Sequence, residues 1–571
     1  MDVFNLYCNL DLQNAVQTAN RAAALENSDR AFPEIGCRRG KPRKGAKLSG
    51  ERTKLFETNH SMKMFFLCFS ILTAAVSTAA IFCFGGFRMN FNAIIDKVDG
   101  FVWGWVMIVL IIGAGILLTV RTRAVQVRHL GSALKYMVKN EEGGHGEVSS
   151  FGALCTALSA TIGTGNIVGV ATAIVAGGPG ALIWMLIAAF FGMATKYSEG
   201  LLAIKYRTVD DEGHALGGPF YYIERGLKEV VGGNWKWLGK IFAVFGALAG
   251  IMGIGTITQI NGITSAANRV FDSPVLFSIG SGDEKRDITL AVVICGAVVT
   301  LCVALVVIGG VKRIANVSSI IVPFMAVAYV LFAIVILIFN ANKIPAAVSL
   351  ACRSAFNVNA VGGAIAGLTL KMAIQKGVGR GIFSNESGLG SAPIAAAAAK
   401  THSCVRQGLV SMTGTFIDTI IICTMTGLTI IVTGAWNPAT TGQNLDAFDV
   451  TAFAWENGLP VNNEACVIIL SLCLAFFAFT TILGWDYYAE RCVEYLLGGK
   501  KKVPLMIFRV LYIVAVAVGP YLTVAAVWGI ADIFNGLMAF PNLVALVFLS
   551  GVVERETKEY FKKDKIKLPQ K

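Results

Sequence analysis

Long apolar runs recur along most of the chain, and they constrain the fold more than any other feature. A helix needs about 20 apolar residues, at a rise of about 1.5 Å each, to cross a hydrocarbon core of about 30 Å. Hydrophobic residues make up 55% of the chain and charged residues only 15%, which is unlike soluble domains. We therefore predict an all-α polytopic membrane protein with about eleven spans, near residues 101–120, 151–177, 180–204, 239–268, 288–309, 316–339, 377–400, 407–433, 464–487, 505–525 and 527–550.

Lysine and arginine in the connections between these runs predict the orientation, because short cytoplasmic loops are enriched in both. Segment 121–150 contains five such residues and segment 434–463 contains none, which places the first inside and the second outside. The basic C-terminal tail, residues 554–571, is then cytoplasmic, in a protein of the cell membrane. Segment 341–376 is predicted outside although it contains lysine and arginine, and we interpret it as amphipathic helices on the membrane surface. The net charge of +13 lies in such flanks, so nucleic acid is not an expected partner.

The N-terminal part differs in composition from the membrane-spanning region, residues 91–553. Residues 1–61 are polar and basic, which is typical of a disordered tail. Residues 62–88 have a lysine before an apolar core and small residues after it, as a signal anchor does. Two interpretations remain open: translation begins at Met62 or Met64, or this segment is a twelfth span.

One apolar run is weakened near its start by glycines. The stretch "SATIGTGNIVGVATAIVAGGPGALIWM" contains Gly163, Thr164, Gly165 and Asn166, which form helix poorly. In hydrocarbon an unpaired backbone group costs several kcal/mol, so a helix is interrupted only where something else satisfies the freed groups. A small polar solute or a cation is such a partner. The alternative is that these glycines only let two helices approach closely.

A second run, "GIFSNESGLGSAPIAAAAAK", has the same character. It places Ser384, Asn385 and Glu386 among glycines, and an ionisable side chain near the midplane is a functional candidate. The two interrupted spans are the second and the seventh, so each opens a set of five after one leading helix. An odd-numbered repeat inverts its direction, and the two interruptions would then meet near the midplane. Asp418 is a further intramembrane acid, which either tunes a cation site or holds a neighbouring helix.

Five stretches together resemble the alanine or glycine:cation symporter family, over residues from about 91 to about 551. This resemblance implies a LeuT-type 5+5 inverted repeat with one extra leading helix, and import of alanine or glycine with sodium. The stretches are "ATIGTGNIVGVATAIVAGGPGALIWM", "FFGMATKYSEGLLAIKYR", "GGPFYYIERGL", "GIFSNESGLGSAPIAAAAAKT" and "LGWDYYAERCVEYLLG".

The resemblance also implies a sodium site between the first interrupted span and the helix at 464–487. The hydroxyls of Thr480 and Thr481 match the pair that the fold uses, and backbone carbonyls near Ser159 and Ile162 would complete the five or six oxygens of a hard cation. The alternative for both threonines is a hydrogen bond to a carbonyl of their own helix.

For the amino acid, the resemblance implies that the carboxylate meets the amides around Gly163 to Asn166. The ammonium would meet Ser384, Asn385 or nearby carbonyls, and Gln259 would also bond the substrate. Trp485 would limit the size of the pocket that holds the side chain of the amino acid to about a methyl group, unless it is an ordinary interfacial tryptophan. Glu386 and Asp418 are candidates for coupling.

The sequence lacks the enzyme motifs HExxH, P-loop and GxSxG, and its five histidines are scattered, so we expect no enzyme and no organic cofactor. Two rival functions remain. One is a proton-coupled amino-acid exchanger that uses Glu386, and the other is a membrane receptor that binds an amino acid without transporting it.

Overall fold

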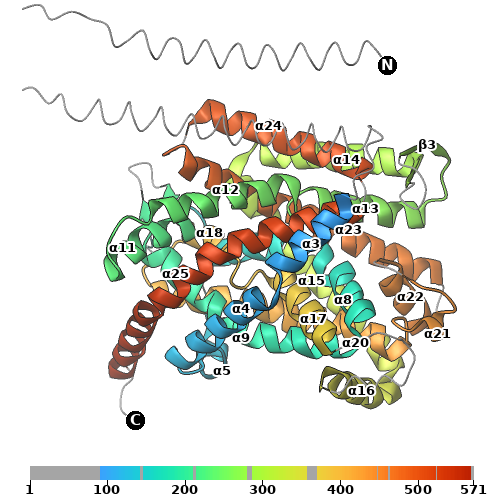
Figure 1. Cartoon of the computed structure of the whole chain (residues 1–571), viewed down its shortest axis with the longest axis horizontal. Coiled ribbons are helices and arrows are strands. Elements are labelled where there is room, and N and C mark those ends of the chain that lie inside the picture. Colours follow the sequence, from blue (N-terminus) through green and yellow to red (C-terminus); the bar gives the residue numbers. More distant parts are fainter. Residues whose placement is uncertain are drawn as a thin grey trace, which may run out of the picture. The chain divides into compact units, whose positions relative to one another are not determined.

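The computed structural model describes residues 91–567, except 140, 142–143, 145, 210–213, 280–285, 357–369, 446–447, 461–462, 500 and 523. Helices make up nearly all of this part, and the predicted fold class, an all-α polytopic membrane protein, is confirmed (Figure 1). The predicted N-terminal tail and signal anchor, residues 1–61 and 62–88, lie outside the described residues.

Eight helices in the described part are long and apolar enough to cross a membrane. They are α9 (Gly180–Lys205), α12 with α13 (Lys236–Met252 and Ile257–Val270), α14 (Leu290–Val307), α15 (Gly310–Phe339), α19 with η6 and α20 (Cys404–Thr415, Phe416–Cys423 and Thr424–Thr433), α23 (Asn463–Leu496), α24 (Lys502–Val518) and α25 (Val524–Lys567).

The other three predicted spans also fall on helices. The leading span is α4 (Trp105–Arg121), and the two interrupted spans are α7 (Ser150–Thr161) with η1 (Gly165–Gly169) and α8 (Val170–Gly177), and α17 (Leu370–Asn385) with α18 (Ala392–Ala397). The shorter helices connect or flank these spans: α3 (Phe91–Val102), α5 (Val125–Arg128), α6 (Leu130–Val138), α10 (Pro219–Tyr221), η2 (Tyr222–Gly226), α11 (Leu227–Val230), η4 (Ala341–Lys343), α16 (Ile344–Phe356), α21 (Pro438–Thr441), α22 (Phe448–Gly458) and η7 (Gly519–Tyr521).

Three features of the connections differ from, or add to, the sequence interpretation. Two short antiparallel hairpins were not predicted: β1 (Thr208–Val209) with β2 (Ala215–Leu216), and β3 (Val275–Ile279) with β4 (Arg286–Thr289). The tail predicted from residue 554 onward continues α25 without a break as far as Lys567. Within segment 341–376, α16 is a helix with buried alanines that packs against both α9 and α20.

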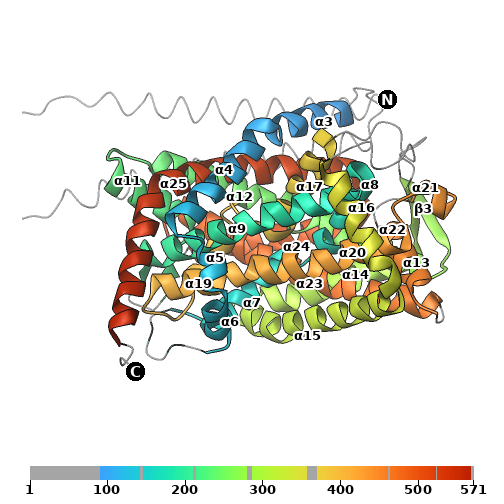
Figure 2. The same ribbon diagram turned by 90° about the horizontal axis from the view of Figure 1, so that it is seen from below.

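Small residues let the helices approach closely around the interrupted spans. A Cβ atom on Gly200 of α9 would lie 2.4 Å from the Ser411 hydroxyl of α19, and one on Gly484 of α23 would lie 2.7 Å from the Ala160 amide of α7. Such contacts are typical of membrane helices, where close packing replaces the hydrophobic effect. Figure 2 shows α9 beside α19 and α17, so α9 lies against the second interrupted span along much of its length.

The two interruptions differ in length. The first occupies residues 162–164, where the span bends by 54°. The second occupies residues 386–391, and Glu386, Gly388 and Gly390 there have φ of 55°, 88° and 84°. A positive φ is costly for any residue with a Cβ, so Glu386 is held in this conformation by its surroundings.

Candidate functional site

The first break turns two backbone amides away from the helix and toward side chains. The Gly163 amide donates to Asn166 Oδ1 at 2.9 Å, and the Thr164 amide donates to Gln259 Oε1 of α13 at 3.1 Å. All four residues are buried. Gln259 therefore satisfies a backbone amide that a continuous helix would have paired, and its bond to the substrate stays a prediction.

The two breaks meet in space. A Cβ atom on Gly165 would lie 3.4 Å from Ser384 Cα and 3.5 Å from the Phe383 ring, so the glycine leaves its neighbours in the second span just enough room. The interruptions are far apart in sequence, and their contact supports a shared site.

Asp418 of η6 bonds to both interrupted spans. Its Oδ1 accepts from Asn166 Nδ2 at 2.8 Å, and its Oδ2 accepts from the Ser384 hydroxyl at 3.0 Å and from the Thr419 hydroxyl at 2.7 Å. Asn385 Nδ2 in turn donates to the Thr419 hydroxyl at 3.0 Å. Of the two roles left open for this acid, the geometry favours the one that holds neighbouring helices.

The proposed sodium ligands are only partly brought together. The Thr481 hydroxyl lies 3.2 Å from the Ile162 carbonyl and 3.0 Å from the Phe477 carbonyl of its own helix. The Thr480 hydroxyl donates to the same Phe477 carbonyl at 3.0 Å and lies 3.6 Å from Met325 Sδ of α15. Thr481 therefore faces the break, and Thr480 faces α15.

Ser159 lies one turn before the break, and its hydroxyl donates to the Thr156 carbonyl of its own helix at 2.8 Å. The side chain is fully buried. Its hydroxyl is therefore bonded within α7. Binding of sodium by its backbone carbonyl stays a prediction.

Trp485 and Glu386 form a buried pair across the second break. The Trp485 indole donates to Glu386 Oε1 at 2.8 Å, and the Ser391 hydroxyl donates to Glu386 Oε2 at 2.5 Å. Trp485 has no exposed surface, so the alternative of an interfacial tryptophan is wrong. The carboxylate joins the two ends of the break to α23.

A scan against protein families gives a match to the model of the sodium:alanine symporter family over residues 88–571. The chain belongs to this family. It is 46% identical to the sodium/alanine symporter AgcS of Methanococcus maripaludis, over 83% of this chain and 98% of that protein. It is 51% identical to an uncharacterized transporter of Haemophilus influenzae, over 84% of this chain and 98% of the relative. The chain is therefore a sodium-coupled amino-acid transporter and not an enzyme.

A more distant likeness is to the crystal structure of MhsT in complex with L-phenylalanine. It covers 73% of this chain and 99% of that one, with 13% sequence identity and a TM-score of 0.45. At that score the likeness carries no weight in the assignment.

Two charged residues of α9 that the sequence analysis did not single out bond the second break of this family member. Lys196 Nζ donates to the Asn385 carbonyl at 2.8 Å, and the Gly390 amide donates to Glu199 Oε1 at 3.1 Å. Both stand in the stretch "FFGMATKYSEGLL", within a predicted span. A lysine and a glutamate inside a membrane-length run were the available signal, because ionisable residues there are rarely incidental.

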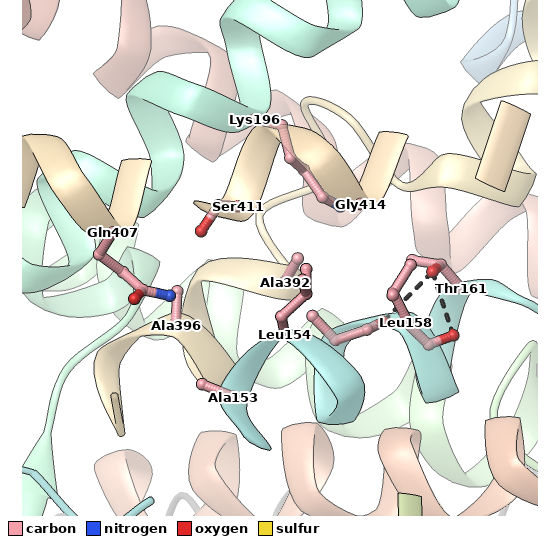
Figure 3. Close-up of a pocket in the computed structure, with 11 residues that line it drawn as sticks. Ala153, Leu154, Leu158, Thr161, Lys196, Ala392, Ala396, Gln407, Ser411 and Gly414 are labelled. Carbon is pink, nitrogen blue, oxygen red and sulfur yellow. Dashed lines mark hydrogen bonds between the residues drawn. The ribbon is translucent and has the colours of Figure 1, made fainter. Parts of the chain in front are cut away.

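A narrow pocket lies beside Lys196, between α7, α9, α18 and α19 (Figure 3). Its lining includes Thr161 at the end of α7 and Ala392 at the start of α18, the residues that flank the two breaks. Gln407 of α19 also lines it, and its buried Oε1 has no hydrogen-bond partner. The end of α7, just before the first break, and the start of α18, just after the second, therefore both line this pocket.

A second ionic cluster joins the start of α7 to the end of α23 in this family member. Arg491 Nη2 lies 3.2 Å from Glu147 Oε1, and Arg491 Nη1 lies 2.7 Å from Glu494 Oε2. His214 Nδ1 lies 3.0 Å from Glu147 Oε1, and its Nε2 lies 3.1 Å from Glu494 Oε1. We call Glu147, His214, Arg491 and Glu494 the His214 cluster.

The protonation of His214 follows from these partners. Burial alone lowers the pKa of His214, but its hydrogen bonds to Glu147 and Glu494 outweigh burial and raise that pKa to about 9. Burial raises the pKa of Glu147, yet its contacts with His214 and Arg491 leave that pKa below its usual value. The cluster is therefore an ion-pair network at neutral pH.

Proposed function

We propose that this protein imports a small neutral amino acid, alanine or glycine, together with sodium, by alternating access. The observation that carries this proposal is the contact of the two breaks, at Gly165 and Ser384, in a chain of the sodium:alanine symporter family. We place the protein in the cell membrane with its C-terminus in the cytoplasm, as the distribution of basic residues predicts.

The amino acid would bind where side chains now satisfy the freed amides. In this proposal its carboxylate takes over the amides of Gly163 and Thr164, which Asn166 and Gln259 now engage. Two N–H groups at the start of a half-helix suit an anionic group. The ammonium would be held by Ser384 and the Asn385 region, both buried beside the first break.

Trp485 supports selection of a small side chain in this arrangement. The indole is fixed by Glu386, so the wall it forms does not move aside easily. One methyl group in an apolar pocket is worth about 1 to 3 kcal/mol, which makes alanine and glycine close competitors.

Sodium would bind between the first break and α23. The Thr481 hydroxyl and the carbonyls of Ile162 and Phe477 lie close together, and oxygen ligands are what a hard cation requires. In this proposal the Ser159 carbonyl would complete the set, and the Thr480 hydroxyl, which faces Met325 of α15, would stay outside it. An ion here would connect α7 to α23. It would therefore stabilise the conformation in which these two helices lie close together over conformations in which they separate.

Alternating access is proposed from the symmetry of the spans. Two sets of five spans, each opened by an interrupted helix, form an inverted repeat of the LeuT type after one leading helix. In such a repeat the two interruptions cross the midplane in opposite directions around one solute, and one set of helices rocks against the other.

The test is uptake of labelled alanine into proteoliposomes that contain the purified protein. We expect accumulation when sodium is higher outside, none when choline replaces sodium, and competition by small neutral amino acids in a broad panel. Accumulation driven by a proton gradient in choline would instead support the proton-coupled exchanger. Binding of alanine without accumulation under any gradient would support the receptor.

A further inference from the structure

The second break leaves more backbone without helical partners than the first. α17 ends at Asn385 and α18 begins at Ala392, and the backbone between them turns through three positive φ values. The last carbonyls of α17 and the first amides of α18 therefore lack partners within their own helices. In a membrane interior these groups need partners from elsewhere.

α9 supplies one partner to each end of this break. Lys196, 2% exposed, donates to the Asn385 carbonyl at 2.8 Å, and Glu199, fully buried, accepts from the Gly390 amide at 3.1 Å. The two side chains are three residues apart, so they lie on the same face of the helix. An ammonium stands in for a missing amide, and a carboxylate stands in for a missing carbonyl.

We infer that Lys196 and Glu199 are positioning residues for transport, which together hold the second break in the shape that presents Ser384 and Asn385 to the solute. The consequence for transport rests on the proposed function, whereas the shape of the break is measurable without it.

The charges of the pair are coupled to each other and to the site. The Lys196 ammonium interacts electrostatically with Glu199, Glu386 and Asp418, so one cation stands among three buried acids. Both side chains bond the same short break from one helix, and substitutions within one such network are rarely additive. The double variant should therefore lose less than the product of the two single losses.

A contact from another span reinforces this arrangement. Asn542 Nδ2 of α25 donates to Glu199 Oε1 at 2.6 Å and to the Gly388 carbonyl at 2.9 Å, and its Oδ1 accepts from the Tyr222 hydroxyl. Glu199 is thus fixed from two sides, and its carboxylate has little freedom to follow a displaced Gly390. A substitution at Lys196 or Glu199 should therefore alter the backbone conformation of all of residues 386–391.

The first measurement is sodium-driven uptake by Lys196→Met, by Glu199→Gln and by the double variant, at equal amounts of protein in proteoliposomes. We expect each single variant to raise KM by about tenfold or more, and the double variant to raise it by less than the product of the two single changes. Lys205→Met is the matched control, because Lys205 lies on the same helix but pairs with Glu556 away from the breaks, at 2.7 Å. It should leave KM unchanged.

The second measurement is hydrogen exchange of the purified protein, read in peptides that cover 381–400 and 159–170. We expect Lys196→Met and Glu199→Gln to accelerate exchange in the first peptide much more than in the second, because the pair bonds only the second break. This comparison holds even if the wild-type protein transports none of the amino acids tested, so it separates this inference from the proposed function.

Three results would overturn the inference: unchanged exchange at 381–400 in both single variants, unchanged KM with a lowered maximal rate, or a double variant whose loss equals the product of the single losses. A purely structural role predicts the second of these. If Lys196→Met fails to reach the membrane, the nearly isosteric Glu199→Gln provides the same measurements, and unchanged KM and exchange in that variant overturn the inference.

Discussion

The Thr481 hydroxyl of α23 donates a hydrogen bond to the Ile162 carbonyl, 3.2 Å away, at the point where the first interrupted span bends. This carbonyl is freed from helical pairing by the break, and α23 provides its partner. The same two oxygens are those we assign to sodium. An ion between them would replace a hydrogen bond that the protein makes within itself.

Thr481→Ala is therefore expected to raise the sodium concentration for half-maximal uptake by about tenfold, which corresponds to the loss of about 1.4 kcal/mol from one polar contact. Thr480→Ala is the matched control, since its hydroxyl faces Met325 rather than the break, and its effect should be several times smaller. Uptake measured against sodium concentration in both variants checks this. Equal sodium dependence in Thr481→Ala and the wild type would show that sodium does not bind at Thr481.

Gly163→Ala should impair binding of the amino acid although it adds a single methyl group. A Cβ at this position would lie 2.5 Å from the Thr481 hydroxyl, closer than real contacts allow, and 3.0 Å from Gln259 Oε1, which is tight. We expect loss of alanine binding by calorimetry, with sodium affinity reduced as well because Thr481 must move.

Gly165→Leu should abolish binding too, because its side chain would extend into Ser384 and Phe383 and favour continuous helix. Gly169→Ala is the control, since Gly169 lies in the same half-helix and a Cβ there meets nothing within 4 Å. Wild-type affinity for alanine in Gly165→Leu would show that the break serves only helix packing, and our site would be wrong.

The sequence predicted the spans and the two interruptions because hydrophobicity and glycine content act locally. It could not predict which hydroxyl faces which helix. Neighbouring residues on a helix point about 100° apart, so Thr480 and Thr481 cannot both face Ile162, and only packing decides between them. The β1–β2 and β3–β4 hairpins were missed because strands of two to five residues give little periodic signal.

The roles of Asp418, Lys196 and Glu199 depended on partners far away in the sequence. Asp418 bonds Asn166, which is 252 residues earlier, and Lys196 bonds Asn385, which is 189 residues later. A charge in an apolar run signals function, but its partner is known only once the helices are packed.

The His214 cluster should make stability depend on pH above neutrality. A histidine whose pKa is raised to about 9 from 6.5 contributes stability that is fully present below pH 6.5 and is lost as the pH rises through about 9. We expect the Tm of the purified protein to fall between pH 7 and pH 9.5, and His214→Gln to lower Tm at pH 7 and to flatten this fall. His402→Gln, at an exposed histidine, should keep the wild-type slope. A wild-type slope in His214→Gln would contradict an ion-paired histidine.

Glu386→Gln tests whether the charge at the second break is needed for the transport cycle. Glutamine keeps an oxygen for the Trp485 indole, and the Ser391 hydroxyl can rotate to accept from the new amide, so the shape of the break is retained. What is lost is one of the three carboxylates around the Lys196 ammonium.

We expect uptake by Glu386→Gln to fall steeply, because the Lys196 ammonium loses one of its counter-charges at the second break, and alanine affinity to fall much less if the acid acts during the conformational change. Trp485→Phe is the companion variant, because it removes the indole donor and keeps the charge. Calorimetry on purified protein and uptake in proteoliposomes are measured on the same samples. Full uptake by Glu386→Gln would exclude this carboxylate from coupling to either sodium or protons, whereas loss of uptake with near-normal binding would place its role after the solute has bound.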